Sequence, residues 1–208
     1  MRFRMLPLAA LALLAVAFPL PLHAGGGHDE GLLDPAWFGK SVEFRSTEEI
    51  DYLWVKPGFS TEGKTLKLAK WSDPVFLGEK RDSKDSAKAY ELTEMMPSRF
   101  KGALAPVAKV SSDAGELVLS GQLVDCTAGS KAAKWLVGMG AGSASATWNL
   151  KIADAASGEV LVAIHHRAIS GTAMSDIEDK IVKWLDEGFI PGYRSNFSDY
   201  AHGKKPKK

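Results

Sequence analysis

One stretch of the sequence has the residue types and the spacing of a phosphate-binding loop. Residues 58–65 read Gly-Phe-Ser-Thr-Glu-Gly-Lys-Thr, which matches the pattern G-x-x-x-x-G-K-[ST]. In such a loop the backbone amides surround phosphates, the lysine reaches the terminal phosphates, and a helix begins at the last hydroxyl residue. The candidate nucleotide-binding residues are therefore Gly58, Gly63, Lys64 and Thr65.

The residues around this stretch favour a loop between two strands over a nucleotide site. From Thr65 onward, apolar and polar residues alternate as in a strand, and Pro74 would end a helix that began there. Glu62 would also place a carboxylate among the phosphates. We therefore expect the loop of a hairpin, and a nucleotide-binding enzyme is kept as the alternative function.

A second glycine-rich stretch, residues 138–142, reads Gly-Met-Gly-Ala-Gly. It lacks the third glycine of a dinucleotide-binding fingerprint, and an expected strand follows it instead of a helix. Alternate residues of a strand share one face, so Gly138, Gly140 and Gly142 would form a flat face that admits another backbone or helix. We expect the protein's own helix to pack there, and docking of a partner at these three glycines is the alternative.

The remaining chemistry-bearing residues do not form a catalytic or metal-binding pattern in the sequence. His165 and His166 are adjacent in an expected strand, so their side chains point to opposite faces and cannot bind one metal together. Cys126 is the only cysteine, so it cannot form an internal disulfide, and it ends an apolar segment that predicts its burial. We expect no catalytic residue, no metal site and no cofactor.

Length and composition are those of an ordinary globular protein. The chain has 208 residues, of which 45% are hydrophobic and 25% are charged. Its 26 basic and 25 acidic residues give a formal net charge of +1, which does not favour nucleic-acid binding. Four lysines and a proline form the basic end at 204–208, so we expect membrane contact to be peripheral at most and to involve this tail.

The first 24 residues predict export. Arg2 and Arg4 precede an uncharged, Leu- and Ala-rich stretch at 6–22, and Ala24 supplies a small residue for cleavage. The prolines and the short length of the stretch favour a cleaved signal peptide over a membrane anchor. A lipid anchor would need a cysteine directly after the stretch, which this sequence lacks. We expect a periplasmic protein without a lipid anchor.

Hydrophobic periodicity predicts an α+β two-layer sandwich, in which two helices cover one face of a mostly antiparallel sheet. Helices are expected at 82–100, with a kink or break at Pro97, and from Ser175 to Gly188. The expected strands are 50–55, 65–71, 105–110, 117–127, 143–153 and 159–169. The expected organisation is a signal peptide at 1–24, a flexible leader at 25–45, one α+β domain at 46–192 and a tail at 193–208.

The stretches 135–144 and 154–161 resemble DUF4410, a family of domains of unknown function. Residues 52–58 also look like the first strand of that family, and the resemblance extends from about Tyr52 to Leu185. It implies a small exported protein of the bacterial envelope, often with a lipid anchor, although this chain lacks the anchor cysteine. The family has no established activity, so no catalytic residue is carried over. We expect a non-enzymatic binding or envelope-assembly module whose partner is an envelope protein or a second copy.

Overall fold

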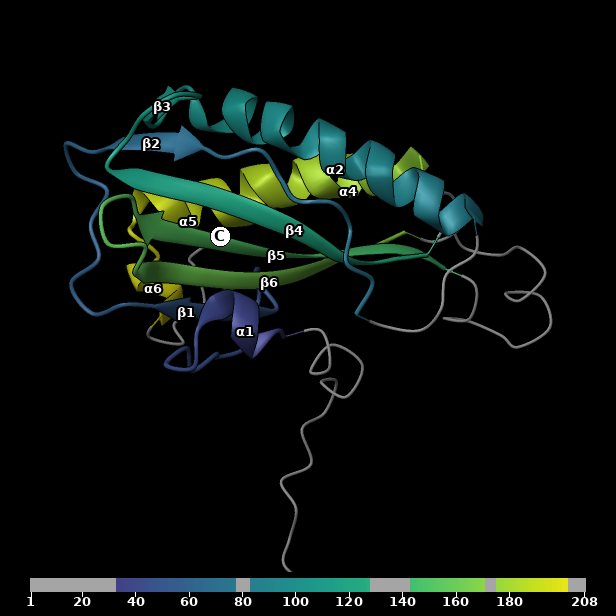
Figure 1. Cartoon of the computed structure of the whole chain (residues 1–208), viewed down its shortest axis with the longest axis horizontal. Helices are drawn as coiled ribbons and strands as arrows, with labels where there is room; N and C mark the ends of the chain where they lie inside the picture. Colours follow the sequence, from purple (N-terminus) through teal and green to yellow (C-terminus); the bar gives the residue numbers. More distant parts are fainter. Residues whose placement is uncertain (1–32, 78–82, 128–142, 171–174, 202–208) are drawn as a thin grey trace, which may run out of the picture.

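Three long antiparallel strands form the centre of the sheet. The computed structural model describes residues 33–77, 83–127, 143–170 and 175–201. Each of the central strands has eleven residues: β4 (Leu117–Thr127), β5 (Ala144–Asp154) and β6 (Val160–Ser170). β5 pairs antiparallel with both of its neighbours (Figure 1). These strands lie close to the residues that hydrophobic alternation predicted, because alternation depends only on the local chain.

Short strands complete the sheet on both sides. They are β1 (Tyr52–Val55), β2 (Thr65–Leu68) and β3 (Lys109–Ser111), in the order β1-β6-β5-β4-β2-β3. β1 is antiparallel to β6, whereas β2 is parallel to both β4 and β3. The sheet is therefore mixed, and the expectation of a mostly antiparallel sheet is wrong. Parallel pairing requires a long connection between the strands, which the helix α2 supplies between β2 and β3.

The helices follow the predicted positions in part. They are α1 (Pro35–Phe38), α2 (Ser83–Leu104), α4 (Ser175–Trp184), the π-helix η2 (Leu185–Phe189), α5 (Ile190–Arg194) and α6 (Ser198–Ala201). α4 begins at the predicted capping residue. α2 continues through Pro97, so the predicted break does not occur.

The second long helix does not end at Gly188 because a widened turn carries it onward. The Ile190 N–H donates to the Leu185 carbonyl, five residues earlier. Pro191 follows directly, and in a regular α-helix its ring would meet the carbonyl four residues before it. The π-turn relieves that clash, so α4, η2 and α5 form one continuous helical segment.

Aromatic rings join the helices to the sheet. The Trp148 ring of β5 lies 5.3 Å from the Trp184 ring of α4, and the Phe100 ring of α2 lies 6.3 Å from Trp184 and 4.9 Å from Phe189. On β5 the residues that share the side of Trp148, here called the Trp148 face, are fully buried. At Gly121 of β4 a Cβ would lie 2.0 Å from the indole of Trp71, so the ring packs directly on the strand.

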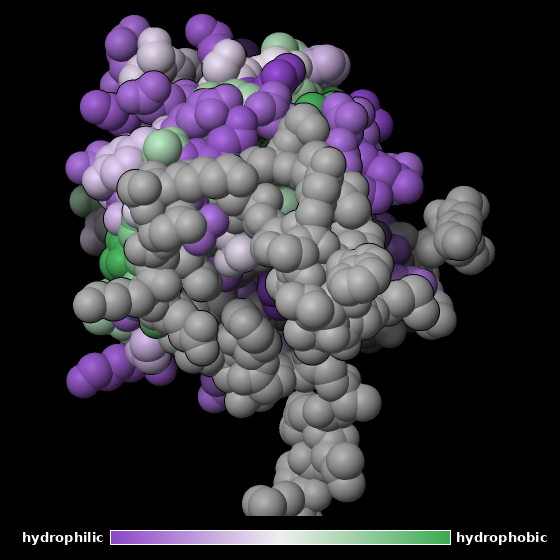
Figure 2. Space-filling view, turned by 90° about the vertical axis from the view of Figure 1, so that its right-hand side faces the viewer, coloured by the Kyte–Doolittle hydropathy of each residue, from purple (hydrophilic) through white to green (hydrophobic). Residues whose placement is uncertain are grey.

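The outer surface has a different character. Where Figure 2 shows described residues, hydrophilic side chains predominate and hydrophobic ones occupy small areas. Among the described residues, we find no helix that combines the length and the apolar character needed to cross a membrane.

Candidate functional site

The phosphate-loop match lies in the connection between β1 and β2. Gly58 and Gly63 have φ values of 79° and 68°, the left-handed conformation that glycine adopts readily in turns. Thr65 begins the strand β2. A strand therefore stands where a phosphate-binding loop needs a helix N-terminus. The connection is not the expected hairpin loop, because β6, β5 and β4 lie between β1 and β2 in the sheet.

A carboxylate of the same chain already accepts a hydrogen bond from one of the backbone N–H groups that would bind phosphate. The Thr65 N–H donates to Glu116 Oε2 at 2.7 Å. That hydrogen bond is the main cause of the lowered pKa of Glu116, and the charges of Lys109 and Lys64 lower this pKa further. Lys64 thus interacts electrostatically with a carboxylate of its own protein.

Of the other residues that the sequence analysis singled out, some lie within the described ranges and some lie outside them. Gly138, Gly140 and Gly142 lie outside the described residues, so the structure has no bearing on their packing. Cys126 is buried, as predicted. Within the described ranges, no three His, Cys, Asp or Glu side chains lie close enough together to bind a metal ion.

The two histidines point to opposite faces of the sheet, as predicted. The His166 ring stacks on Trp184, with 4.5 Å between centroids and an interplanar angle of 12°. His165 is fully buried on the other face, where its Nδ1 lies 2.6 Å from Asn149 Oδ1. Burial lowers the pKa of His165 to about 4, so this ring is neutral at neutral pH.

A groove lined by described residues lies at the outer edge of β1 and is here called the β1 groove. Its volume is about 620 Å³, which lies in the usual range of ligand pockets. Three segments line it: one before β1, one that comprises β1 and the turn after it, and one that runs from the end of α5 to the first residue of α6. The lining residues are Glu43, Arg45, residues 53–59, Ser195, Asn196 and Ser198.

The backbone of β1 faces this groove at Val55. Arg45 and Leu53 exchange backbone hydrogen bonds of 2.9 and 2.8 Å on the outer side of β1. On the inner side, the Lys56 N–H donates to the Leu161 carbonyl at 2.8 Å. Because backbone groups alternate in direction along a strand, Val55 directs its N–H and C=O outward as Leu53 does. The edge of the sheet is therefore covered at Leu53 and open to the groove at Val55.

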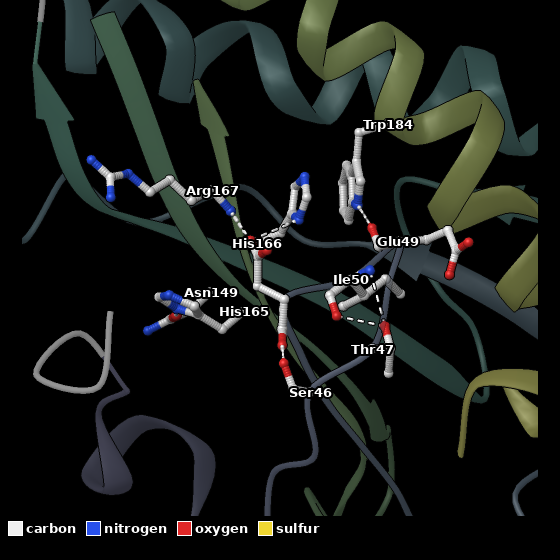
Figure 3. A network of polar contacts seen from close by, with 10 residues as sticks. Ser46, Thr47, Glu49, Ile50, Asn149, His165, His166, Arg167 and Trp184 are labelled. Carbon is white, nitrogen blue, oxygen red and sulfur yellow. Dashed lines mark hydrogen bonds and ion pairs between the residues drawn. The ribbon is translucent and has the colours of Figure 1, made fainter. Parts of the chain in front are cut away.

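A polar network fixes the chain that leads into β1. The Asp51 carboxylate accepts a hydrogen bond of 2.7 Å from the Arg167 N–H and lies 3.0 Å from His166 Nδ1 (Figure 3). Burial alone would raise the pKa of Asp51, but the hydrogen bond and charge of His166 and the Arg167 N–H outweigh it, so this pKa is lowered. The carboxylate thus joins the start of β1 to β6.

Further contacts attach the same segment to the helices. The Thr47 Oγ1 donates to the Ile50 carbonyl at 2.5 Å and accepts from the Ile50 N–H at 3.0 Å. The Glu49 carbonyl accepts the indole N–H of Trp184 at 3.0 Å. A Cβ at Gly188 would lie 3.1 Å from that carbonyl, so the glycine allows the segment to pass close to η2. These contacts hold residues 46–51 between the sheet and the helical segment.

The opposite wall of the groove is also fixed by long-range contacts. Asn196 Oδ1 accepts hydrogen bonds from the N–H and the hydroxyl of Thr61, at 2.8 and 2.9 Å. Asn196 and Phe197 have φ values of 54° and 56°, which are uncommon for residues other than glycine. The buried Phe197 ring packs against Phe189, at 5.8 Å between centroids, and holds this conformation in place.

Sequence reasoning did not find the groove, because two of its three walls lie in segments assigned to a flexible leader and a tail. One signal for order in the leader is present. Asp34 precedes Pro35, which is a typical helix start, and the Asp34 side chain indeed accepts a hydrogen bond from the Ala36 N–H at 2.9 Å. No comparable local pattern marks the groove wall at 195–198.

Comparison with known proteins identifies a family and distant folds. The family described as "Domain of unknown function (DUF4410)" has a model that matches residues 57–174. The match begins after β1 and ends before α4, so it is shorter than the expected resemblance. No curated protein matches the chain.

Several solved structures are distantly similar. A PelC dodecamer from Paraburkholderia phytofirmans is 10% identical with a TM-score of 0.41, covering 64% of this chain and 94% of its own. A variant of that dodecamer is 11% identical with the same TM-score and covers 64% of this chain and 92% of its own. Protein XCC0632 from Xanthomonas campestris, described by the family model DUF330, is 11% identical with a TM-score of 0.38, covering 74% of this chain and 91% of its own. Likenesses at these scores carry no assignment of function.

Proposed function

The chain belongs to the DUF4410 family, whose model matches more than half of it, and we propose that it is a non-enzymatic binding or assembly module of a bacterial envelope. The observation that carries this proposal is the β1 groove, a cavity with three walls at an open edge of the sheet. A preformed cavity of this size suits binding.

The proposal also states where in the cell the protein acts. The basic, apolar and small-residue order of residues 1–24 supports export with cleavage after Ala24. The mature protein would then act in the periplasm without a lipid anchor. Its partner would be an envelope protein or a second copy, with membrane contact at most peripheral through the tail at 204–208.

We also infer that α2 and α4 cover the same face of the sheet, the Trp148 face. Ring contacts support this arrangement, because Trp184 of α4 contacts both Trp148 of β5 and Phe100 of α2. In Figure 1 both helices lie above the strands.

The alternative function, a nucleotide-binding enzyme, is supported by the motif at 58–65 alone. Two observations are inconsistent with that alternative: a strand begins at Thr65, and the Thr65 N–H donates a hydrogen bond to Glu116. A Lys64 substitution tests it directly and is described among the predictions below.

Site-specific crosslinking in the native bacterial host tests the binding proposal. A photoreactive phenylalanine derivative replaces Glu43, an exposed residue that lines the groove, or Glu62, an exposed residue outside it. We expect a discrete adduct from position 43 and none from position 62. Equal adducts from both positions, or none from position 43, would contradict a binding role for the groove.

Intact-mass measurement of the protein recovered from the periplasm tests the export proposal. We expect a chain that begins at Gly25. Recovery of the full-length chain from the cytoplasm would contradict the proposed location.

A further inference from the structure

We infer that the β1 groove binds an extended polypeptide segment of another protein, which adds as a short strand to β1 at Val55. This inference rests on the proposed function and names the chemistry of the partner. The argument has three steps: the unused backbone groups, the shape of the groove, and its charge.

The first step concerns the backbone of Val55. Its outward N–H and C=O form a donor and an acceptor at the open edge of the sheet. The backbone groups of Leu53 instead pair with Arg45, and the Lys56 N–H pairs with the Leu161 carbonyl. The register of Arg45 with Leu53 would place Glu43 opposite Val55 if the pairing continued. The pairing does not extend from the Arg45–Leu53 bridge to Glu43 and Val55, and both of these residues line the cavity instead. An extended peptide presents the complementary acceptor and donor at the required spacing.

The second step concerns shape. Glu43 and Arg45 form one wall and Ser195, Asn196 and Ser198 form another, so the edge at Val55 is recessed. A ligand that reaches Val55 must therefore enter between these walls, as a single extended segment can. The apolar floor, which includes Leu53, Val55 and Phe59, suits an apolar side chain on the incoming strand.

The third step concerns charge. Lys56 forms an ion pair with Glu159, and the remaining charged side chains of the lining are Arg45 and Glu43, which have opposite signs. The groove therefore has no excess of positive charge to favour a phosphate or an anionic lipid head group. Backbone pairing and apolar contact remain as the sources of affinity.

The walls are held before any ligand arrives. One wall is fixed through Thr61 and Asn196, and the chain that leads into β1 is fixed through Glu49 and Trp184. A preorganised groove lowers the entropic cost of binding an extended segment. We therefore expect measurable affinity from a short peptide.

The test uses short peptides selected from a random phage-displayed library on the exported protein. Synthetic peptides are then measured by fluorescence anisotropy against the wild type, a groove-blocking Glu43→Trp variant and a matched Glu62→Trp control. Both replaced residues are exposed, so the fold is expected to persist, and circular dichroism verifies it. We expect a loss of about tenfold or more with Glu43→Trp, comparable to the loss of a short backbone pairing, and no change with Glu62→Trp.

N-methylation of the peptide, one residue at a time, tests strand addition without altering the protein. The peptide residue opposite Val55 directs its amide toward β1, so we expect methylation at that residue to abolish binding and methylation of its two neighbours, whose amides point away, to have little effect. Binding that is lost with Glu43→Trp but insensitive to methylation would overturn strand addition and leave the groove as a binding site.

Two further outcomes would overturn the inference. In the first, no peptide is selected, or the selected peptides bind Glu43→Trp as well as they bind the wild type, so an extended segment is not the occupant. The crosslinking experiment at position 43 then still tests the proposed function separately. If sedimentation shows that the wild type self-associates and Glu43→Trp does not, the occupant is a second copy.

Discussion

The two edges of the sheet differ in how their backbones meet the surroundings. β3, at one edge, has three residues and carries the exposed Lys109 at its start. A short strand with a charged residue resists pairing with other chains. β1, at the other edge, is recessed in a groove and is covered by the bridge from Arg45 at Leu53. The charge at β3 therefore protects that edge from pairing, whereas the groove at β1 leaves a short part of the edge backbone available to a ligand.

The edges also differ in the contacts behind them. The chain that leads into β1 is tied to β6 through Asp51 and to α4 through Glu49. β3 pairs with β2 and contacts α2. Substitutions behind β1 should therefore cost much more stability than substitutions at β3.

The largest expected effect is at Trp184. Trp184→Ala removes a ring that is 6% exposed and contacts Phe100, Trp148 and His166. We expect a loss of about 3–5 kcal/mol in the free energy of unfolding, the usual cost of truncating a buried aromatic residue. Urea unfolding measures it.

Two controls sharpen this prediction. Trp184→Phe keeps most of the ring but loses the hydrogen bond to Glu49, so we expect a smaller loss, about 1–2 kcal/mol. Lys109→Ala, on the β3 edge, should change stability by less than about 0.5 kcal/mol. Equal effects of Trp184→Ala and Lys109→Ala would remove the contrast between the edges.

The next effect is a pH dependence caused by His165, which lies beside Tyr52 of β1 with 5.7 Å between ring centroids. Its pKa is lowered from 6.5 to about 4, so the unfolded chain binds more protons than the folded protein between these values. Stability is therefore complete above pH 6.5 and falls as the pH decreases toward 4. The loss is about 3 kcal/mol by linkage.

His165→Gln removes this titration and keeps a side chain that hydrogen-bonds with Asn149. We expect unfolding free energies measured from pH 7 to pH 4 to decrease less in the variant than in the wild type. His166→Gln is the control for the adjacent ring on the other face. Parallel pH profiles for the wild type and His165→Gln would show that another group causes the acid sensitivity.

A smaller effect is expected at Asn196 in the groove wall. Asn196→Ala loses the two hydrogen bonds from Thr61 and places alanine at a φ of 54°, so we expect a loss of about 1–2 kcal/mol. Asn196→Gly loses the same bonds but accepts the conformation, and should lose about 1 kcal/mol less. If the two variants unfold at the same urea concentration, the left-handed conformation does not contribute.

The smallest expected effect is at Lys64, on the loop between β1 and β2. Equilibrium dialysis with MgATP should show background retention for both the wild type and Lys64→Ala, because the Thr65 N–H is already bonded to Glu116. Lys109→Ala is the control for loss of a nearby charge. Retention by the wild type that Lys64→Ala abolishes would favour the nucleotide-binding alternative over the non-enzymatic proposal.

Features that depend on local periodicity could be predicted from the amino-acid sequence. The positions of β4, β5 and β6, the start of α4 at Ser175, the opposite orientations of His165 and His166 and the burial of Cys126 all follow from patterns within about a dozen residues. The family resemblance also follows from such local stretches, since the matched region lies within residues 57–174.

The way in which those elements pack together could not be predicted from local patterns and became apparent in the three-dimensional structure. The direction of β2 beside β4 depends on the path of the connection through α2, which hydrophobic alternation does not encode. The β1 groove depends on hydrogen bonds between residues far apart in sequence, such as Thr61 with Asn196 and Glu49 with Trp184. Turn and edge residues gain their roles from these distant partners, so their own types and spacing carry little information about the site they form.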